Sequence, residues 1–277
     1  MTTPQVSVLI TAFNREKYIG QAIESVLASS FGDFELIVVD DHSTDRTVEI
    51  VREYMKRDLR ISLFVNEQNL GDYPNRNRAA GYASGKYLKY VDSDDLIYPW
   101  GLQAMVDAME RFPNAVMGIS ALERDLSQPF PFELSPRAAY EYNYQGPGLF
   151  DRSPLATIIR KKAFDESGGF PPLRMVGDIS LWHHLAARHP VVVMSEGLVW
   201  NRLHDEQEWV HYSKFLAEYE KIRRQYLLAE DCPLDPQAVK TILRKRRLNN
   251  SRDLVQAFAR FNLDESKEYL KIAWLYR

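Results

Sequence analysis

Three carboxylates within four residues, Asp92, Asp94 and Asp95, follow directly behind the hydrophobic run from Tyr87 to Val91. A strand that ends in such a cluster holds its acids at the rim of a sheet. Their mutual repulsion is tolerable there if a cation or a set of hydrogen-bond donors is shared. Asp94, with Asp92 and Asp95 nearby, would hold a divalent cation that bridges diphosphate oxygens. The sequence therefore predicts a site for a metal-bound polyphosphate.

Polar side chains also follow three earlier hydrophobic runs. They are Thr11 and Asn14 around the end of residues 6–13, Asp40 and Asp41 after 34–39, and Asn69 and Gly71 after 60–65. In open sheets of parallel strands, ligands bind beyond the carboxyl ends of the strands. We therefore expect these side chains and the acids of residues 92–95 to line one site.

The hydrophobic runs alternate with helical patterns. Residues 6–13 and 34–39 are nearly continuously apolar, as in strands covered on both faces, and Ile19 to Leu27 repeats with helical spacing. The pattern predicts further strands at 60–65, 86–91 and 115–121, and helices capped by Ser43 or Thr44, over 77–84 and over 101–111. This alternation predicts an α/β fold with an open, mainly parallel sheet flanked by helices.

The second half of the chain is less regular. Residues 123–152 lack periodicity and mix prolines with aromatics, which predicts a functional loop or lid. Its aromatic rings either bind sugar rings or pack against one another. After Gly197 a strand to Leu203 is expected, followed by helical spacing that predicts a helical C-terminal appendage.

Composition narrows the class of protein. With 277 residues the chain has room for one α/β domain and an appendage, and its net charge of −3 argues against a nucleic-acid binder. The single Cys232 cannot form an intrachain disulfide, so a reduced, cytoplasmic protein is expected. No signal peptide or membrane span is expected, which leaves at most peripheral contact at the inner face of a membrane.

The turn after the first strand excludes two common nucleotide sites. It runs from Thr11 to Lys17 without a glycine. A dinucleotide-binding Rossmann turn and a P-loop both need glycines there, because the backbone must approach the phosphates closely. The phosphates must therefore be bound by other means, consistent with the acid cluster and its cation.

Several ordered motifs make the chain resemble the family 2 glycosyltransferases of the GT-A fold, in their non-processive bacterial form. The motifs are Val8–Asn14, Val38–Asp45, Asn69–Gly71 with Arg76-Asn77, Gly85–Tyr87 and the D-x-D element Asp92-Ser93-Asp94. The resemblance implies a Rossmann-like, mostly parallel open sheet that binds a nucleotide-sugar.

The resemblance also implies roles for individual residues. It gives Thr11, Phe13 and Asp41 to the base, Asp92 and Ser93 to the ribose, and Asp94 to a Mn²⁺ or Mg²⁺ ion, with Asp95 as a second metal contact. The rest of the implied nucleotide-sugar site comprises Ala12, Asn14, Asn69, Gly71, Arg76 and Asn77.

Asp178 is the candidate catalytic base. Asp178, Trp182 and Leu185 fall on one helical face, so the carboxylate should point inward, where desolvation raises its pKa. The family places its catalytic carboxylate at such a position, commonly as Glu-Asp, whereas here the first residue is Gly177. The alternative is a simple N-cap on a core helix.

The segment Asn201–His204 resembles the Arg-x-His segment of the family. The resemblance implies that His204 completes the metal shell and that Arg202 contacts the leaving diphosphate. His183 and His184 are interpreted as helix-face residues. The basic run 244–247 is either a solvated helix face or a contact to an anionic membrane surface.

These observations predict a metal-dependent, inverting glycosyltransferase that adds single sugars. The processive motif Q-x-x-R-W is absent from the sequence. Asp41 suits the imide N–H of uracil, which favours a UDP-sugar donor and leaves a GDP-sugar open. The acceptor is a saccharide or lipid-linked hydroxyl in surface polysaccharide or glycolipid assembly, an expectation from resemblance alone.

Two alternatives are a non-catalytic nucleotide-sugar-binding protein and a sugar-phosphate nucleotidyltransferase. The second would need a glycine-rich basic loop after the first strand, which the chain lacks. We expect a catalytic domain over residues 1–205, with a donor part at 1–121 and an acceptor part at 122–205, and the appendage at 206–277.

Overall fold

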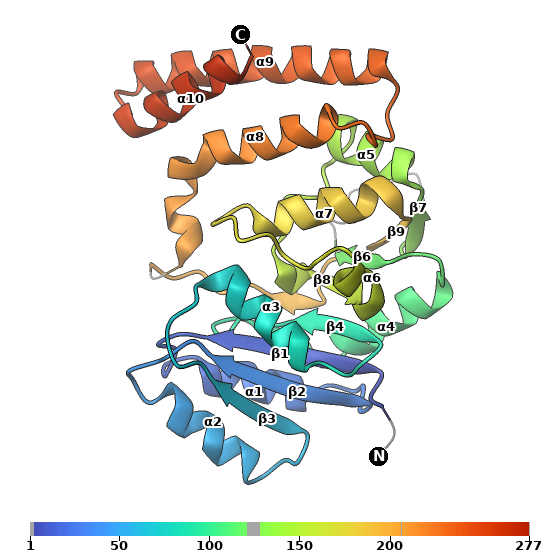
Figure 1. The fold of residues 1–277 in the computed structure, drawn as a ribbon, viewed down its shortest axis with the longest axis vertical. Helices are drawn as coiled ribbons and strands as arrows, with labels where there is room; N and C mark the ends of the chain where they lie inside the picture. Colours follow the sequence, from blue (N-terminus) through green and yellow to red (C-terminus); the bar gives the residue numbers. More distant parts are fainter. Residues whose placement is uncertain (1–2, 121–127, 206, 277) are drawn as a thin grey trace.

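An eight-stranded mixed sheet, covered by helices, forms the centre of the protein (Figure 1). The computed structural model describes residues 3–120, 128–205 and 207–276. The strand order is β3-β2-β1-β4-β8-β6-β9-β7. The expected open, mostly parallel sheet flanked by helices is confirmed, with antiparallel pairs confined to its second half.

The first half of the sheet is parallel, and it aligns the ends of its strands. Residue pairing runs from Val6 opposite Phe34 to Ala12 opposite Asp40, so both strands end at one edge. Their side chains are almost entirely buried because helices cover both faces. The elements are β1 (Val6–Ala12), α1 (Ile19–Leu27), β2 (Phe34–Asp40), α2 (Thr47–Met55), β3 (Ile61–Val65), α3 (Asp72–Tyr82) and β4 (Tyr87–Tyr90).

The second half adds strands that the sequence analysis did not predict. β8 lies antiparallel between β4 and β6, and β9 pairs with β6 in parallel. A separate two-stranded sheet joins β5 to β10, and β10 lies within the strand expected between Gly197 and Leu203, although it is only two residues long. The elements are β5 (Leu96–Ile97), α4 (Gly101–Arg111), β6 (Met117–Ser120), β7 (Phe132–Leu134), α5 (Pro136–Gln145), η1 (Pro154–Ala156), β8 (Thr157–Arg160), α6 (Lys161–Glu166), α7 (Gly177–Arg188), β9 (Val191–Met194) and β10 (Val199–Trp200).

Two helix starts differ from the predictions. α2 begins at Thr47 and has no side-chain cap, because Ser43 and Thr44 instead hydrogen-bond to Asn14 of the preceding turn. α3 begins at Asp72, five residues earlier than expected, directly after Gly71, whose φ of 85° turns the chain into the helix. α3 therefore brings Asp72 and Tyr73 to the carboxyl edge of the sheet.

The segment predicted as a structureless loop is largely ordered. Within residues 128–152 it contains β7 and α5, and α5 is capped by the Ser135 side chain with Pro136 in its first turn. Tyr140 and Phe150 are buried and pack edge-on against His183. Aromatic packing therefore accounts for these rings. Residues 121–127, which include the end of the expected strand 115–121, lie outside the described residues.

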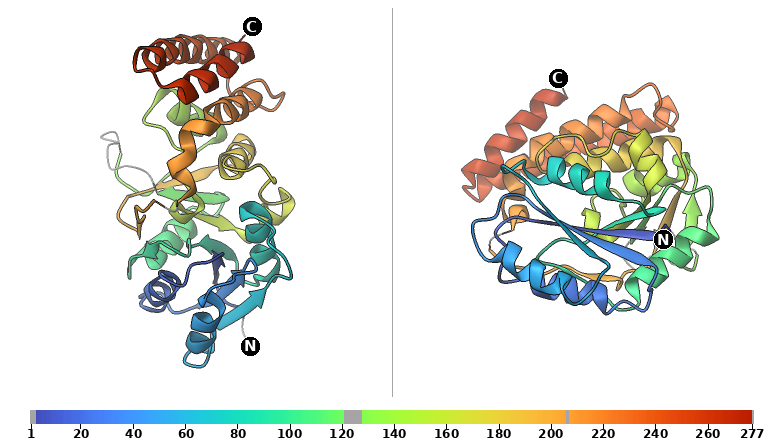
Figure 2. Two further views of the ribbon diagram at one scale, coloured as in Figure 1. Left: turned by 90° about the vertical axis from the view of Figure 1, so that its left-hand side faces the viewer. Right: turned by 60° about the horizontal axis from the view of Figure 1, so that its bottom comes forward.

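The expected helical C-terminal appendage is confirmed. Figure 2 shows α8, α9 and α10 stacked at the end of the molecule opposite β2, β3 and α2. The buried Glu220 carboxylate joins three of them, because it accepts hydrogen bonds from Arg246 and Tyr276. The elements are η2 (Glu208–Phe215), α8 (Leu216–Leu227), α9 (Pro236–Ala259) and α10 (Leu263–Leu275). Among the described helices, none combines the length and apolar character that crossing a bilayer requires.

Candidate active site

A cleft of about 780 Å³ lies at the carboxyl ends of β1 to β4. The strand ends form one wall, and residues of α7, η2 and α8 form the other. Most of the site residues expected from the sequence line it, namely Thr11, Ala12, Phe13, Asp41, Asn69, Gly71, Arg76, Asp92, Ser93, Asp94, Asp95 and Asp178. The lining does not include Asn14, Asn77, Arg202 or His204.

Asp41 shapes the floor of the cleft by holding the loop after β3. Its carboxylate accepts hydrogen bonds from the Asn66 side chain at 2.7 Å, the Leu70 N–H at 2.8 Å and the Gly71 N–H at 2.9 Å. A carboxylate can accept about four hydrogen bonds. Three are used within the chain, which leaves roughly one for a base imide.

Arg76 bridges two acids instead of lying free for a ligand. Its Nε donates to Asp72 at 2.7 Å, and its Nη2 donates to Asp92 at 2.6 Å. Its Nη1 is buried and has no hydrogen-bond partner in the described part of the chain. The neighbouring acids, which outweigh the effect of burial, raise the pKa of Arg76 well above its usual range. The side chain is therefore a fixed positive charge beside Asp92.

Asp94 and His204 form the pair that fits a divalent cation. His204 Nε2 lies 3.0 Å from Asp94 Oδ2. Two adjacent ligands of an octahedral Mg²⁺ site, each about 2.1 Å from the metal, stand about 3.0 Å apart. Both side chains are mostly buried, and His204 Nδ1 has no partner within the described residues. The donor set therefore suits a cation whose remaining ligands are phosphate oxygens and water.

The carboxylate of the other expected metal ligand, Asp95, already accepts hydrogen bonds from the protein. It accepts hydrogen bonds from the Arg202 N–H at 2.7 Å and from the Asn201 amide at 3.2 Å. Burial and the nearby Asp92 charge raise its pKa to about 8. Among the described residues, no group of three or more His, Cys, Asp or Glu side chains is arranged around one point as metal ligands.

Arg202 is placed differently from its expected role. Its guanidinium stacks on the rings of Tyr18 and Trp200 and donates to the carbonyl of Asp94 at 2.8 Å and to Gln21 at 2.6 Å. The guanidinium that lines the cleft is that of Arg15, whose Nε lies 3.2 Å from Asp94 Oδ2. Sequence reasoning missed Arg15, although it directly follows Asn14 in the first-strand turn.

Asn14 and Asn77 serve as connectors in this structure. The Asn14 side chain accepts the Thr44 N–H at 2.9 Å and so joins the turns after β1 and β2. The Asn77 side chain makes two hydrogen bonds to the Phe170 backbone, at 2.8 and 2.9 Å. Asn77 thereby fixes the segment that leads into α7.

Asp178 lies in the first turn of α7 and lines the cleft opposite the acid cluster. Burial raises its pKa to about 7, although hydrogen bonds from the Ile179 N–H and the Tyr73 hydroxyl oppose the rise. The Asp72 charge adds to it, and the Arg76 charge opposes it. A carboxyl group with this pKa exchanges protons readily near neutral pH.

Two tyrosines beyond Asp178 were not predicted as site residues. Tyr212 of η2 and Tyr219 of α8 line the cleft, with ring centroids 4.9 Å apart. In the sequence, Tyr219 is part of the helical spacing of the C-terminal segment, which does not reveal which face meets the sheet. Together they give the second wall an aromatic surface.

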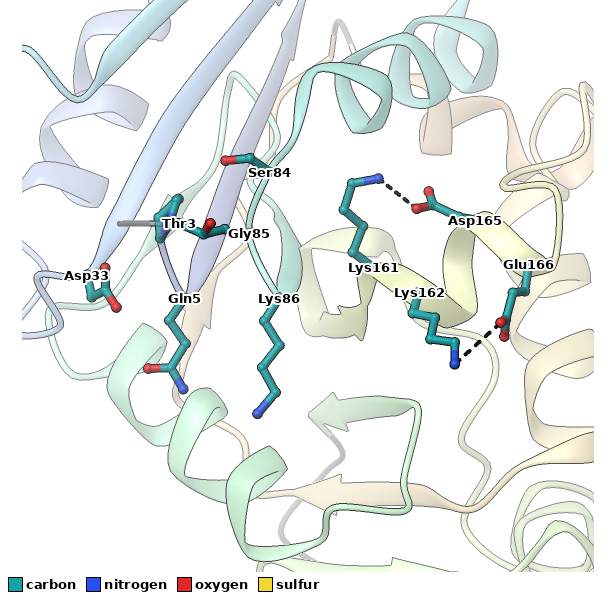
Figure 3. Close-up of a pocket in the computed structure, with 11 residues that line it drawn as sticks. Thr3, Gln5, Asp33, Ser84, Gly85, Lys86, Lys161, Lys162, Asp165 and Glu166 are labelled. Carbon is teal, nitrogen blue, oxygen red and sulfur yellow. Dashed lines mark hydrogen bonds and ion pairs between the residues drawn. The ribbon is translucent and has the colours of Figure 1, made fainter. Parts of the chain in front are cut away.

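A second hollow, of about 740 Å³, lies near the amino ends of β1 and β4 (Figure 3). Its three lysines each pair with an acid: Lys86 with Glu110, Lys161 with Asp165 and Lys162 with Glu166. Its positive charges are thus locally balanced, and none of the site residues predicted from the sequence lines it. The first cleft is the better candidate for an anionic ligand.

Two solved structures share the fold of the chain. One is S. aureus TarS 1–349 in complex with UDP-GlcNAc, with a TM-score of 0.70, 22% identity and coverage of 96% of this chain and 78% of that one. The other is the mannosyltransferase PcManGT from Pyrobaculum calidifontis with GDP-Man and Mn²⁺, with a TM-score of 0.67, 17% identity and coverage of 99% and 81%. Both likenesses support the GT-A fold.

Sequence comparison points to the same family. A GalNAc(5)-diNAcBac-PP-undecaprenol beta-1,3-glucosyltransferase from Campylobacter jejuni is 34% identical over 124 residues, which are 44% of this chain and 40% of the relative. The first curated relatives are matched over only about a third of their length. The family model for glycosyl transferase family 2 matches residues 7–168, more than half of the chain. The chain therefore belongs to glycosyl transferase family 2.

Proposed function

We propose that the protein is a metal-dependent, inverting, non-processive glycosyltransferase that moves a sugar from a nucleotide-diphospho-sugar to an acceptor hydroxyl. The observation that carries this proposal is the placement of two chemistries across one cleft. Asp94 lines one wall and, with His204 3.0 Å from it, offers ligands for a cation. Asp178 lines the other wall and offers a base. A donor diphosphate and an acceptor hydroxyl can therefore meet between them.

In this mechanism Asp178 removes the proton from the acceptor hydroxyl. The hydroxyl oxygen forms the new bond to the anomeric carbon as the bond from that carbon to the diphosphate oxygen breaks, and the electron pair leaves with the nucleoside diphosphate. One displacement inverts the configuration of the anomeric carbon. Arg15 lines the same cleft and places positive charge near the leaving group.

A bound Mn²⁺ or Mg²⁺ would neutralise the developing charge on the diphosphate. Asp94 and His204 would hold it, and Asp95 would position the loop that carries His204 through its bonds to Asn201 and Arg202. Asp95 therefore supports the metal site in this proposal and does not itself need to bind the metal.

We favour a UDP-sugar as the donor. Thr11, Phe13 and Asp41 lie together in the cleft, and the remaining acceptor position of Asp41 suits the imide N–H of uracil. The two structural neighbours carry a UDP-sugar and a GDP-sugar, so both donors belong in the first test.

The acceptor side of the cleft suits a saccharide. Tyr212 and Tyr219 present aromatic faces next to Asp178, and sugar rings stack on such faces. The Campylobacter relative is named for a saccharide on a lipid diphosphate. We propose a saccharide or lipid-linked acceptor in surface polysaccharide or glycolipid assembly on the cytoplasmic side, with catalysis in residues 1–205.

Calorimetric titration tests the donor site. UDP, GDP and dTDP are each titrated with Mn²⁺, with Mg²⁺ and with EDTA. Metal-dependent binding of UDP is expected, whereas binding of none of the three under any condition would refute the donor assignment. Hydrolysis or transfer from the matching nucleotide-sugar then distinguishes an enzyme from a protein that only binds the donor.

A further inference from the structure

The turn between α9 and α10 exposes an unusual density of large apolar side chains. Val255, Phe258, Phe261 and Leu263 are 67%, 49%, 89% and 67% exposed. We call residues 255–263 the hairpin tip. Figures 1 and 2 place it at a free end of the helix pair, on the side of the molecule toward which β1 to β4 point. Four such side chains within nine residues form a patch, in contrast to isolated exposed apolar residues.

Charge is divided unevenly between this hairpin and the rest of the chain. Residues 236–277 contain ten Lys and Arg against four Asp and Glu, a net charge of +6. Because the whole chain carries −3, residues 1–235 carry −9. Arg244, Lys245 and Arg252 of α9 are exposed, and no ion pair is found for them within the described residues.

We propose that the hairpin tip docks on an anionic lipid bilayer, with its apolar side chains among the headgroups and the basic side chains of α9 against the lipid charges. Helices that lie on membranes combine these features, and each basic residue near an anionic surface adds about 1 kcal/mol. A protruding turn suits a deformable headgroup layer. The acidic body would be repelled, so only this end of the molecule makes contact.

Flotation with vesicles tests the proposal on the full chain. Vesicles of phosphatidylcholine with phosphatidylglycerol should bind the wild type, and pure phosphatidylcholine should bind it about tenfold more weakly, with binding weakened by salt. The variant Phe258→Ser/Phe261→Ser/Leu263→Ser should lose about tenfold or more in binding. The variant Arg244→Glu/Lys245→Glu/Arg252→Glu should lose selectivity for anionic vesicles.

The matched control is Leu59→Ser, which removes a fully exposed leucine from the turn before β3 and should bind as the wild type does. Equal binding of wild type and tip variant, or no binding of wild type to anionic vesicles, overturns the proposal. A wild-type dimer by light scattering that becomes a monomer in the tip variant also overturns it, because a second copy would then cover the tip.

A different observation concerns Tyr73 and Gly177. The Tyr73 side chain is buried beside α7 and lines the cleft together with Asp178, and its hydroxyl lowers the pKa of the Asp178 carboxyl. A Cβ atom on Gly177 would lie 2.7 Å from Tyr73 Cδ2 and 2.8 Å from the Pro171 carbonyl oxygen. Residue 177 can thus carry no side chain while the Tyr73 ring keeps this place. A glutamate at position 177 would therefore displace the Tyr73 ring.

The geometry points to Tyr73 as the positioning residue of the Asp178 carboxylate, an inference that rests on the proposed role of Asp178. The other charged or titratable groups near this carboxylate are Asp72 and Arg76 of α3 and Tyr219 of α8. Among these neighbours, Tyr73 is also the residue whose ring packs against Gly177, directly before Asp178. The ring holds the carboxylate at the mouth of the cleft, and the hydroxyl stabilises its charged form.

The test is the pH profile of kcat/KM for Tyr73→Phe. Loss of the hydroxyl should move the acid limb to higher pH by about one pH unit, with UDP affinity unchanged. Gly177→Ala, which displaces the ring, should move the limb the same way. Tyr226→Phe, which removes a phenol that pairs with the Ser180 hydroxyl of α7 and does not line the cleft, should leave the limb in place.

The outcomes separate this inference from the proposed function. If Asp178→Asn retains transfer, Asp178 is not the base, and both the proposed mechanism and the positioning role of Tyr73 are refuted. If Asp178→Asn abolishes transfer but Tyr73→Phe leaves the acid limb unchanged, only the positioning role of Tyr73 is refuted. Thermal unfolding must show that the Tyr73→Phe protein is folded before its pH profile is interpreted.

Discussion

Asp178 holds its carboxylate where charge is unfavourable, and this should affect stability as well as catalysis. Folding raises its pKa from 3.8 to about 7, mainly through burial. Between these values the folded protein retains a proton that the unfolded chain has lost. The contribution of Asp178 to stability is therefore highest below pH 4 and falls as the pH rises through pH 7.

Asp178→Asn should separate these two consequences. We expect at least a hundredfold loss of kcat, because general bases contribute on the order of 10²-fold or more. We also expect stability at pH 8 to rise by ~1–3 kcal/mol relative to the wild type, with little difference at pH 4. Turnover assays and thermal unfolding at both pH values measure the two effects. A variant that is less stable at pH 8 would contradict the burial argument.

The pairing of His204 with Asp94 gives a second prediction at this scale. His204→Ala should weaken Mn²⁺-dependent UDP binding by roughly tenfold to a hundredfold and leave any binding in EDTA unchanged. His184→Ala is the matched control, because His184 pairs with Arg188 on the face of α7. Calorimetry with and without metal measures both variants. Equal losses in metal and in EDTA would mean that His204 shapes the cleft without binding metal.

At the level of residues, sequence patterns located the acidic side chains of the cleft better than its arginines. Thr11 lies near the end of β1, and Asp41 and the residue 92–95 cluster come after β2 and β4, so strand ends place them in the cleft. Arg15 and Arg202 lie in turns, and their long, flexible side chains can point in several directions. Which guanidinium enters the cleft depends on stacking against Tyr18 and Trp200, contacts that join distant segments and leave no local pattern.

At the level of elements, the loop after β3 depends on a single carboxylate. Asp41→Asn should destabilise the protein by ~1–3 kcal/mol and weaken nucleotide binding, because an amide group would face the N–H groups of Leu70 and Gly71. Asp40→Asn is the control, since Asp40 Oδ1 is buried with no hydrogen-bond partner in the described part of the chain and Oδ2 can still accept the Ser43 N–H. Thermal unfolding and calorimetry compare them. Equal effects would argue against the loop-holding role of Asp41.

The segment 128–152 shows where element prediction failed and which signal was available. Ser135-Pro136 is a typical helix start, with a capping hydroxyl and a proline in the first turn. The aromatics obscured it, because their burial against His183 of α7 depends on tertiary contacts. The strand β8 was missed for a related reason, because it pairs with β4 and β6, which lie far from it in sequence, and such pairing leaves no local pattern.

At the level of the whole molecule, the attachment of the α9–α10 hairpin depends on Glu220. Removing this carboxylate leaves Arg246 without its buried partner, so Glu220→Ala should destabilise the protein by ~3–5 kcal/mol. Hydrogen exchange should rise in α9 and α10 before it rises in β1 and β2. Glu53→Ala, which removes an exposed ion pair with Lys56, is the control. Uniform exchange across the chain would contradict a separate hairpin unit.

The overall topology was predictable only in its first half. The alternation of strands and helices up to β4 determines a parallel sheet, because each crossover helix returns the chain in the same direction. The second half mixes parallel and antiparallel pairs between strands that are far apart in sequence, such as β4 with β8. No periodicity encodes such pairing, so the sequence indicated an open sheet without its full order.

The uneven distribution of charge makes the protein a large electric dipole. With +6 on residues 236–277 and −9 on the remainder, its behaviour toward a charged surface depends on which end arrives first, although the net charge is only −3. Near neutral pH and at low ionic strength, the same preparation should be retained by both anion-exchange and cation-exchange resins. An applied field, or a charged surface approached from solution, would therefore turn the molecule before any specific contact forms.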